Sequence, residues 1–412
     1  MKIAQINMLT NGSTGQIMFQ IANTARSYGF KANTYSPIPF VRGKKNKLTT
    51  CKNHFWWGSR FESFLHYYVG TLFGNNGLLS ICGTRQLIKN LKNFSPNVIH
   101  LHNIHGFCIN IPMLFNYIKK NNINVIWTLH DCWAFTGHCP YFTMVECDKW
   151  KTGCYKCPQY RDYPKSIFDN SKKMYRLKKK WFTGVENLTI VPPSEWLAGL
   201  VKQSFLKDYP VKVIHNGIDL NVFKPTESDF RKKYNISDSK YILLGVAFGW
   251  GKRKGLDVFI ELQKRLDKEK YRIVLVGTDN NADKQLPKEI ISIHRTQNQT
   301  ELAGIYTAAD LFVNPTREEN YPTVNMESIA CGTPVITFST GGSPECINEK
   351  SGMVVDCDDI DGLQHGIEKI CEQNLFSTAD CIEQAKQFDM NEKFKEYLKL
   401  YEDRAYYAQR SI

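Results

Sequence analysis

Short apolar runs alternate with longer amphipathic stretches over the first half of the chain. The runs suit buried strands, and the stretches between them carry apolar residues at helical spacing, which is the pattern of strand–helix–strand units around a parallel sheet. We expect strands at residues 2–7, 98–101, 125–129 and 188–191.

The second half repeats this pattern. Helical spacing at residues 256–268 and 301–309 separates further apolar runs. We expect these runs to form strands at residues 241–246, 272–276, 311–313 and 335–338.

The fold class is therefore α/β, with two Rossmann-like parallel-sheet domains that face each other across a cleft. The predicted domains are residues 1–209 and 210–390. Residues 391–412 are expected to form a terminal helix that packs back on the N-terminal domain, because apolar residues recur there at helical intervals. These residues are Phe394, Leu398, Tyr401 and Tyr406.

Composition excludes several classes of protein. A disordered chain is excluded by its 24 Phe, 20 Tyr and 8 Trp residues, and no run of 18 apolar residues suggests a membrane-spanning helix. Gln5 and Asn7 interrupt the apolar core that a signal peptide needs, so we expect a cytoplasmic protein whose cysteines are mostly buried thiols.

Charge differs between the two halves. Residues 1–212 carry 28 Lys and Arg against 9 Asp and Glu, whereas residues 213–412 carry 25 against 31. The basic half is expected to face an anionic partner such as a phosphorylated substrate, a membrane surface or a nucleic acid. We do not expect a nucleic acid, because no nucleic-acid-binding motif is recognisable.

The segment at residues 314–335 carries the strongest chemical signal. A strand is predicted to end just before it, and a helix is predicted to begin near Pro322 and stop at Gly332. Glu319 then lies in the loop, and Glu327 lies one turn into the helix. A helix N-terminus beside two carboxylates suits a ligand that carries both phosphate and hydroxyl groups, although a lone pair of surface acids would be the simpler explanation.

This segment resembles the donor-site signature of the retaining glycosyltransferases of family 4, which have the GT-B fold. The signature has two Glu residues separated by seven positions and then Gly-x-Pro-Val, which match Glu319, Glu327 and residues 332–335. Residues 306–310 and 340–345 also match. The resemblance implies that Glu319 holds sugar hydroxyls, that Glu327 holds the ribose, and that three neighbouring residues line the donor site. These are Asn320, Tyr321 and Thr323.

Further site residues follow from the same resemblance. Lys254 lies in a basic loop after a predicted strand and matches the lysine that contacts the donor diphosphate, with Arg253 as its partner. Without the resemblance, a solvated basic loop would explain this segment. Gly15 matches the glycine near the donor phosphates, and His130 matches the histidine that touches the transferred sugar. Three other histidines are expected to line the acceptor side: His100, His102 and His105.

The predicted activity is sugar transfer with retention of anomeric configuration, of the hexosyltransferase type. The donor is a nucleotide-sugar, no cofactor or catalytic metal is required, and the diphosphate leaves as the acceptor hydroxyl approaches the same face of the sugar. The expected acceptor is a lipid-linked glycan in bacterial surface-polysaccharide assembly. A GT-B sugar-nucleotide epimerase or phosphorylase, and a non-enzymatic anion-binding protein, are the alternatives.

Five cysteines lie within residues 132–157, and four of them have spacings that could chelate a structural Zn²⁺. Buried thiols and a disulfide are competing interpretations. The four candidate ligands are Cys139, Cys147, Cys154 and Cys157. Residues 356–358 resemble a metal-binding Asp-x-Asp motif, but we expect them to lie in a surface loop.

Two segments suggest peripheral attachment to the inner face of the cytoplasmic membrane. Residues 167–182 read as a basic amphipathic helix, and residues 55–68 are rich in aromatic side chains. Both features are typical of surfaces that meet anionic lipid. A helix packed on the core with a solvated basic face explains residues 167–182 equally well.

Overall fold

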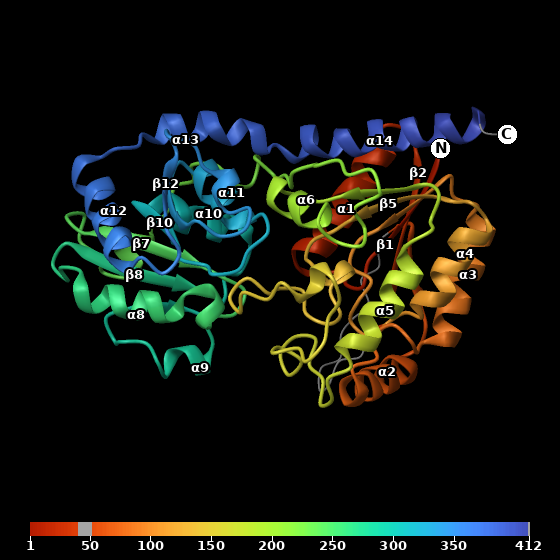
Figure 1. Ribbon diagram of the computed structural model, residues 1–412. Helices are drawn as coiled ribbons and strands as arrows, with labels where there is room; N and C mark the ends of the chain where they lie inside the picture. The colour runs from red at the N-terminus through yellow and green to blue at the C-terminus, as the bar shows by residue number, and fades with distance from the viewer. Residues whose placement is uncertain (40–51, 411–412) are drawn as a thin grey trace. The chain divides into compact units, whose positions relative to one another are not determined.

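The computed structural model describes residues 1–39 and 52–410, and its contacts divide the chain into two compact units (Figure 1). Unit 1 comprises residues 1–214 and 394–412, and unit 2 comprises residues 215–393. The chain therefore leaves unit 1 once and returns to it near its end. No helix within the described ranges is both long and apolar enough to cross a bilayer.

Unit 1 contains a parallel sheet that has six strands among the described residues, in the order β3-β2-β1-β4-β5-β6. In the register of the sheet, Ile3 lies opposite Ala32 of β2 and Val98 of β4. The strand order reverses beside β1, which is where ligand sites form in open α/β sheets. The strands are β1 (Lys2–Ile6), β2 (Lys31–Pro37), β3 (His54–Trp57), β4 (Val98–Leu101), β5 (Asn124–Thr128) and β6 (Leu188–Val191).

The two faces of this sheet differ in polarity. One face contributes Ile6, Leu101 and other apolar side chains to a core shared with α3, α4 and α5. The other face carries buried polar residues, including His100 and Thr128. The helices of unit 1 are α1 (Gly12–Ser27), α2 (Arg60–Phe73), α3 (Ile81–Phe94), α4 (Ile111–Lys120), α5 (Ser171–Phe182), α6 (Glu195–Val201) and the part of α14 (Met390–Arg410) that begins at Phe394.

The last helix, α14, joins unit 1 through its tyrosines. His100 Nδ1 lies 2.6 Å from the Tyr401 hydroxyl, and the Thr128 hydroxyl lies 3.0 Å from that of Tyr397. Phe394 is also buried. These contacts satisfy the polar side chains on the second face of the sheet. The side chain of Tyr406, which belongs to the same predicted spacing, lies outside the described residues.

Unit 2 contains a second parallel sheet, with six strands among the described residues in the order β12-β11-β10-β7-β8-β9. Alternate residues of each strand face opposite cores. Leu244 and Phe312 pack with α10 and α11, whereas Leu243 and Val313 pack with α8 and α12. The strands are β7 (Tyr241–Val246), β8 (Tyr271–Val276), β9 (Ile291–Ile293), β10 (Leu311–Asn314), β11 (Val335–Phe338) and β12 (Gly352–Val355).

The helices of unit 2 cover both faces of its sheet (Figure 1). They are α7 (Phe230–Lys233), α8 (Leu256–Arg265), α9 (Asn280–Asp283), α10 (Gln299–Ala308), α11 (Thr323–Ala330), α12 (Ile360–Gln373) and α13 (Thr378–Ala385). The predicted fold class, two Rossmann-like parallel-sheet units, is confirmed.

Candidate active site

Three loops lie together at the carboxyl ends of neighbouring strands in unit 2. They follow β7, β10 and β11, which are adjacent in the sheet. The backbone N–H of Arg317 donates to the carbonyl of Arg253 at 2.9 Å, and the Thr340 hydroxyl donates to the carbonyl of Thr316 at 2.7 Å. These bonds fix the loop after β10 between the other two loops.

Lys254 and Glu319 form an ion pair across two of these loops. Burial raises the pKa of the Glu319 carboxyl, but the charge and hydrogen bond of Lys254, together with the charge of Arg253, outweigh burial and hold that pKa below its ordinary value. The backbone N–H of Asn320 donates to Glu319 Oε1 at 3.1 Å. Glu319 is therefore an ionised acceptor at neutral pH.

Gly341 supports Glu319 through a close backbone contact. A Cβ atom at this position would lie 1.7 Å from the Glu319 carbonyl oxygen, and the φ angle of Gly341 is +57°. Both facts require glycine. The glycine-containing motif at residues 340–345 therefore shapes the loop that carries Glu319.

Glu327 lies in α11 and has the opposite electrostatic environment. The Tyr306 hydroxyl donates to Glu327 Oε2 at 3.2 Å, and Thr323 also hydrogen-bonds to this carboxyl. Burial dominates and raises the pKa of Glu327 to about 7. Near neutral pH the Glu319 carboxyl is therefore ionised, whereas the Glu327 carboxyl is partly protonated.

A buried amide and hydroxyl network anchors the start of α11. Asn314 Nδ2 donates to Asn325 Oδ1 at 2.8 Å, and Asn325 Nδ2 donates to Ser343 Oγ at 3.0 Å. Thr337 Oγ1 lies 2.8 Å from the same Ser343 hydroxyl. This network connects β10, α11 and β11 and fixes the N-terminal turn of α11 relative to the sheet.

Arg317 ties the basic loop to the motif, a role that the sequence did not reveal. Its guanidinium makes two bonds of 2.8 Å to Asp257 at the start of α8 and one of 2.7 Å to Asp358. Asp358, part of the Asp-x-Asp sequence, is therefore an ion-pair partner. Arg253, the predicted diphosphate ligand, donates from Nη1 to the Glu318 carbonyl at 3.2 Å.

The predicted residue Tyr321 is buried. Its ring stacks on that of His215, with centroids 4.7 Å apart and planes 16° apart. Asn320 beside it is also buried. Thr323 begins α11, after Pro322 at the N-cap.

In unit 1, histidines cluster beyond the ends of β4 and β5. His102 Nδ1 lies 3.2 Å from His130 Nε2, and His102 Nε2 lies 3.0 Å from the side-chain amide of Gln5. Burial is the largest influence on His130 and lowers its pKa to about 4, although the nearby Asp131 carboxylate raises it. His130 is therefore neutral at pH 7.

His105 belongs to a second group beside this cluster. Its Nε2 lies 3.0 Å from Asp131 Oδ2, and its Nδ1 lies 3.3 Å from the Tyr163 hydroxyl. His100 instead packs under α14, so it supports the fold. Of the three predicted acceptor-side histidines, His102 and His105 lie with His130 around one small cavity.

Gly15 lies against the turn that follows β1. Helix α1 begins at Gly12, so Gly15 lies in its first turn and not in the preceding loop. A Cβ atom on Gly15 would lie 2.5 Å from the backbone carbon of Thr10. This glycine lets the helix pack closely on the turn after β1.

Two family models match this chain over adjacent segments. Residues 60–222 match the model of Glycosyltransferase Family 4, and residues 226–388 match that of Glycosyl transferases group 1. The chain belongs to the family 4 glycosyltransferases. This membership favours sugar transfer over the two alternatives that the sequence left open.

Known proteins resemble the glycosyltransferase over most of its length. A relative from Escherichia coli K12, named for glycosyl transfer in colanic acid biosynthesis, is 22% identical over 294 residues, which cover 69% of this chain and 70% of the relative. Sucrose-phosphate synthase from Thermosynechococcus elongatus has a TM-score of 0.70 at 16% identity, with 98% of both chains covered. Anabaena HepE in complex with UDP has a TM-score of 0.66 at 14% identity, covering 98% of this chain and all of that one. These structures confirm the GT-B fold.

The segment with five cysteines, residues 132–157, is called here the cysteine-rich loop, and its cysteines are free thiols. The four predicted zinc ligands line one cavity, where Cys139 and Cys157 hydrogen-bond to each other and the Gly137 N–H donates to Cys154 Sγ at 3.0 Å. In the part of the chain that the structure describes, no group of three or more His, Cys, Asp or Glu side chains is placed to hold a metal ion. The zinc hypothesis has no support from this geometry.

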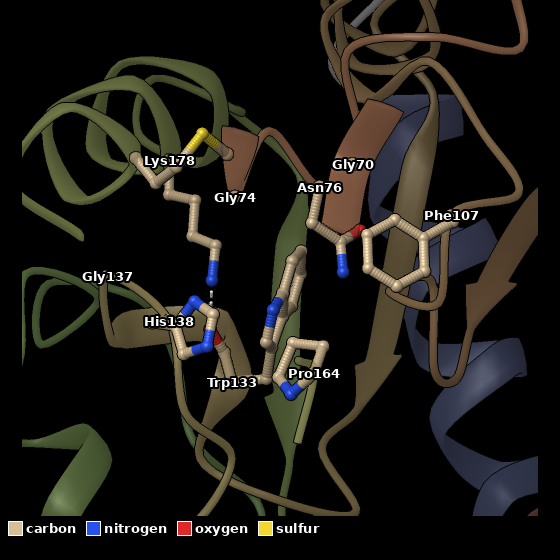
Figure 2. Close-up of a pocket in the computed structure, with 10 residues that line it drawn as sticks. Gly70, Gly74, Asn76, Phe107, Trp133, Gly137, His138, Pro164 and Lys178 are labelled. Atoms are coloured by element: carbon tan, nitrogen blue, oxygen red, sulfur yellow. Dashed lines mark hydrogen bonds between the residues drawn. The ribbon is translucent and has the colours of Figure 1, made fainter. Parts of the chain in front are cut away.

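The Lys178 side chain is buried, whereas the sequence predicted it on the solvated basic face of an amphipathic helix. Figure 2 shows its side chain reaching into a pocket beside His138 and Trp133. The ammonium donates to the carbonyls of Trp133 at 2.7 Å and Thr136 at 3.1 Å, and lies 3.4 Å from the centre of the Trp133 ring. Burial lowers its pKa to about 7. Lys178 thus fixes the start of the cysteine-rich loop.

Proposed function

We propose that this glycosyltransferase transfers a hexosyl group from a nucleoside diphosphate sugar to a lipid-linked glycan, with retention of configuration, during assembly of a bacterial surface polysaccharide. Unit 2 binds the donor in this proposal, and unit 1 binds the acceptor. The observation that carries it is the Lys254–Glu319 ion pair at the carboxyl edge of the unit 2 sheet.

The donor site follows from the charges around this pair. Lys254 and Arg253 neutralise the negative charge that grows on the leaving diphosphate, together with the N–H groups in the first turn of α11. Ionised Glu319 accepts hydrogens from sugar hydroxyls, and Glu327 does the same for the ribose once it has lost its proton. UDP is a suitable first probe, because the similar Anabaena protein is in complex with it.

Retention follows if the acceptor attacks on the face from which the diphosphate leaves. The acceptor oxygen bonds to the anomeric carbon as the bond to the diphosphate oxygen breaks, and the hydroxyl proton passes to that departing oxygen. No side chain forms a covalent intermediate. His130, neutral at pH 7, contacts the transferred sugar in this scheme and is not required to take up a proton.

The charge of the N-terminal half indicates the kind of acceptor in this proposal. The excess of cations in residues 1–212 suits a phosphate-bearing, membrane-held acceptor. The Escherichia coli relative, which is named for colanic acid biosynthesis, supports a polysaccharide product. Peripheral attachment at the inner face of the cytoplasmic membrane is part of the same proposal.

A donor screen tests this function. Thermal shift with UDP, GDP and their common hexose conjugates should identify one nucleotide sugar that stabilises the wild type. Glu319→Gln should keep the fold yet lose most transfer with that donor, and proton NMR of the product should show the anomeric coupling of the donor retained. Unchanged turnover in Glu319→Gln, or an inverted product, contradicts the proposal.

A further inference from the structure

Helix α2 turns an apolar side to solvent. Five of its exposed large side chains, at positions 61, 64, 65, 68 and 72, have the spacing of one helix face. Phe61 at one end is 75% exposed. We refer to this face as the α2 stripe, which consists of Phe61, Phe64, Leu65, Tyr68 and Leu72.

Polar contacts on the inner side fix this orientation. The Glu62 carboxylate accepts from the N–H groups of Cys82 and Gly83, both at 2.8 Å, at the start of α3. His66 Nδ1 lies 2.8 Å from the Ser80 hydroxyl, and a Cβ on Gly70 would lie 2.3 Å from the Phe107 ring. Rotating the helix to bury the stripe would break these contacts, so the stripe is held outward.

A neighbouring loop extends the stripe. The N–H of Ile167 donates to the Thr71 carbonyl at 2.8 Å, and that of Phe168 donates to the Leu72 carbonyl at 3.3 Å. Both side chains are exposed, and the Phe168 ring stacks on that of Phe73. The result is a continuous exposed apolar surface on unit 1, of the kind that marks an interaction site.

The charges beside this surface indicate the partner. Asn170 Nδ2 donates to the Phe73 carbonyl at 3.1 Å, which brings the start of α5 to the end of α2. Residues 159–180 carry eight Lys and Arg but two acids. One of these acids, Asp169, accepts from the N–H groups of Cys157 and Ser171. The exposed cations at the start of α2 and within residues 161–173 are Arg60, Arg161, Lys165, Lys172 and Lys173.

Helix α5 has a different role from α2. Met174, Trp181 and Phe182 are buried in the unit 1 core, so its apolar side is occupied and its basic side faces solvent. The core-packed interpretation of residues 167–182 therefore applies to this helix. It supplies charge beside the stripe and does not itself expose an apolar face.

We propose that the α2 stripe, with Ile167 and Phe168, inserts into the interfacial layer of an anionic lipid bilayer while the flanking cations meet the headgroups. Apolar and aromatic side chains bordered by Lys and Arg are the combination that binds such membranes. The inference rests on the proposed function, because it holds the enzyme at the surface that carries a lipid-linked acceptor.

Vesicle co-sedimentation of the full chain tests this inference. Wild type should bind vesicles of phosphatidylethanolamine and phosphatidylglycerol, bind pure phosphatidylcholine much more weakly, and dissociate as salt is raised. The triple variant Phe61→Ser/Leu65→Ser/Phe168→Ser should lose at least tenfold in partitioning. The matched control is Tyr28→Ser/Leu375→Ser, which removes exposed apolar side chains elsewhere and should bind as the wild type does.

Two further measurements separate the outcomes. The thermal shift caused by UDP should be equal in wild type and triple variant, so a failure of membrane binding is distinguishable from a failure of the proposed donor site. If the triple variant misfolds by circular dichroism, the single variant Phe61→Ser should still weaken binding. The inference would be overturned if the wild type did not bind anionic vesicles, or if the triple variant bound them as the wild type does. It would also be overturned if the wild type were a dimer and the triple variant a monomer.

Discussion

Lys254 holds Glu319 in its ionised form, although the two side chains come from loops that follow different strands of unit 2. A carboxylate that is already ionised and oriented accepts hydroxyl hydrogens without reorganising. Its partner ammonium remains close enough to meet a second anion. The pair therefore joins the sugar and diphosphate ends of the proposed donor site.

Removing either member of this pair should impair transfer. We expect Glu319→Gln and Lys254→Met each to lower kcat/KM by about 10²- to 10³-fold, the usual effect of losing one preorganised electrostatic group. The double variant should lose less than the product of the two single effects, because the groups act as a unit. Steady-state kinetics of all four proteins measure this coupling, and fully multiplicative losses would show that the two groups act independently and not as a pair.

Glu327 should make donor binding depend on pH. Burial raises the pKa of Glu327 to about 7, so its carboxylate, the form that accepts two ribose hydrogens, forms as the pH rises from 6 to 8. Across that interval the ionised fraction grows about tenfold, and KM for the donor should fall correspondingly. Glu327→Gln should have weaker donor binding and a flat profile, and an unchanged slope in that variant would assign the titration to another group.

The contact between His100 and Tyr401 should stabilise unit 1. Tyr401→Phe removes the hydroxyl that lies 2.6 Å from His100 Nδ1 and leaves a buried ring nitrogen unpaired. We expect the free energy of unfolding to fall by about 1–3 kcal/mol. Burial lowers the pKa of His100 to about 3, so this loss should be the same at pH 6 and pH 8. Urea unfolding measures it, with the exposed Tyr28→Phe as control.

Lys178 should give folding a distinctive pH dependence. Burial lowers the pKa of Lys178 from its ordinary 10.5 to about 7, so between these values the unfolded state binds the proton that the folded state lacks. Stability from this group therefore increases with pH across that window, by about 1.4 kcal/mol per pH unit. Compared with Lys178→Met, the wild type should gain stability between pH 7.5 and 9 in urea unfolding. Parallel curves for the two proteins would rule out this titration.

Several strands could be predicted from the sequence because buried parallel strands consist of consecutive, mostly apolar residues. The runs at residues 98–101, 188–191 and 335–338 coincide with β4, β6 and β11. Strand β3, at one edge of the unit 1 sheet, was missed because its composition is mixed. It includes the exposed Phe55, so only its partner strand reveals its conformation.

The site was predictable as a motif but not as a set of interactions. The surrounding motif and its resemblance to the family 4 donor-site signature identified Glu319 and Glu327, yet their opposite pKa shifts depend on the charge of Lys254 and on the burial of Glu327. Arg317 and Asn325 were overlooked because an arginine in a polar loop and an asparagine in a helix look like surface residues. Their partners come from segments distant in sequence, which a single sequence does not reveal.

The chain returns to unit 1 only after unit 2, and this order limits when unit 1 can complete its fold. Phe394, Tyr397 and Tyr401 complete the second face of a sheet whose first strand begins at Lys2. These side chains can dock only after all of unit 2, residues 215–393, has been synthesised. Until then, His100 and Thr128 lack the hydroxyls of Tyr401 and Tyr397 that they contact in the finished fold.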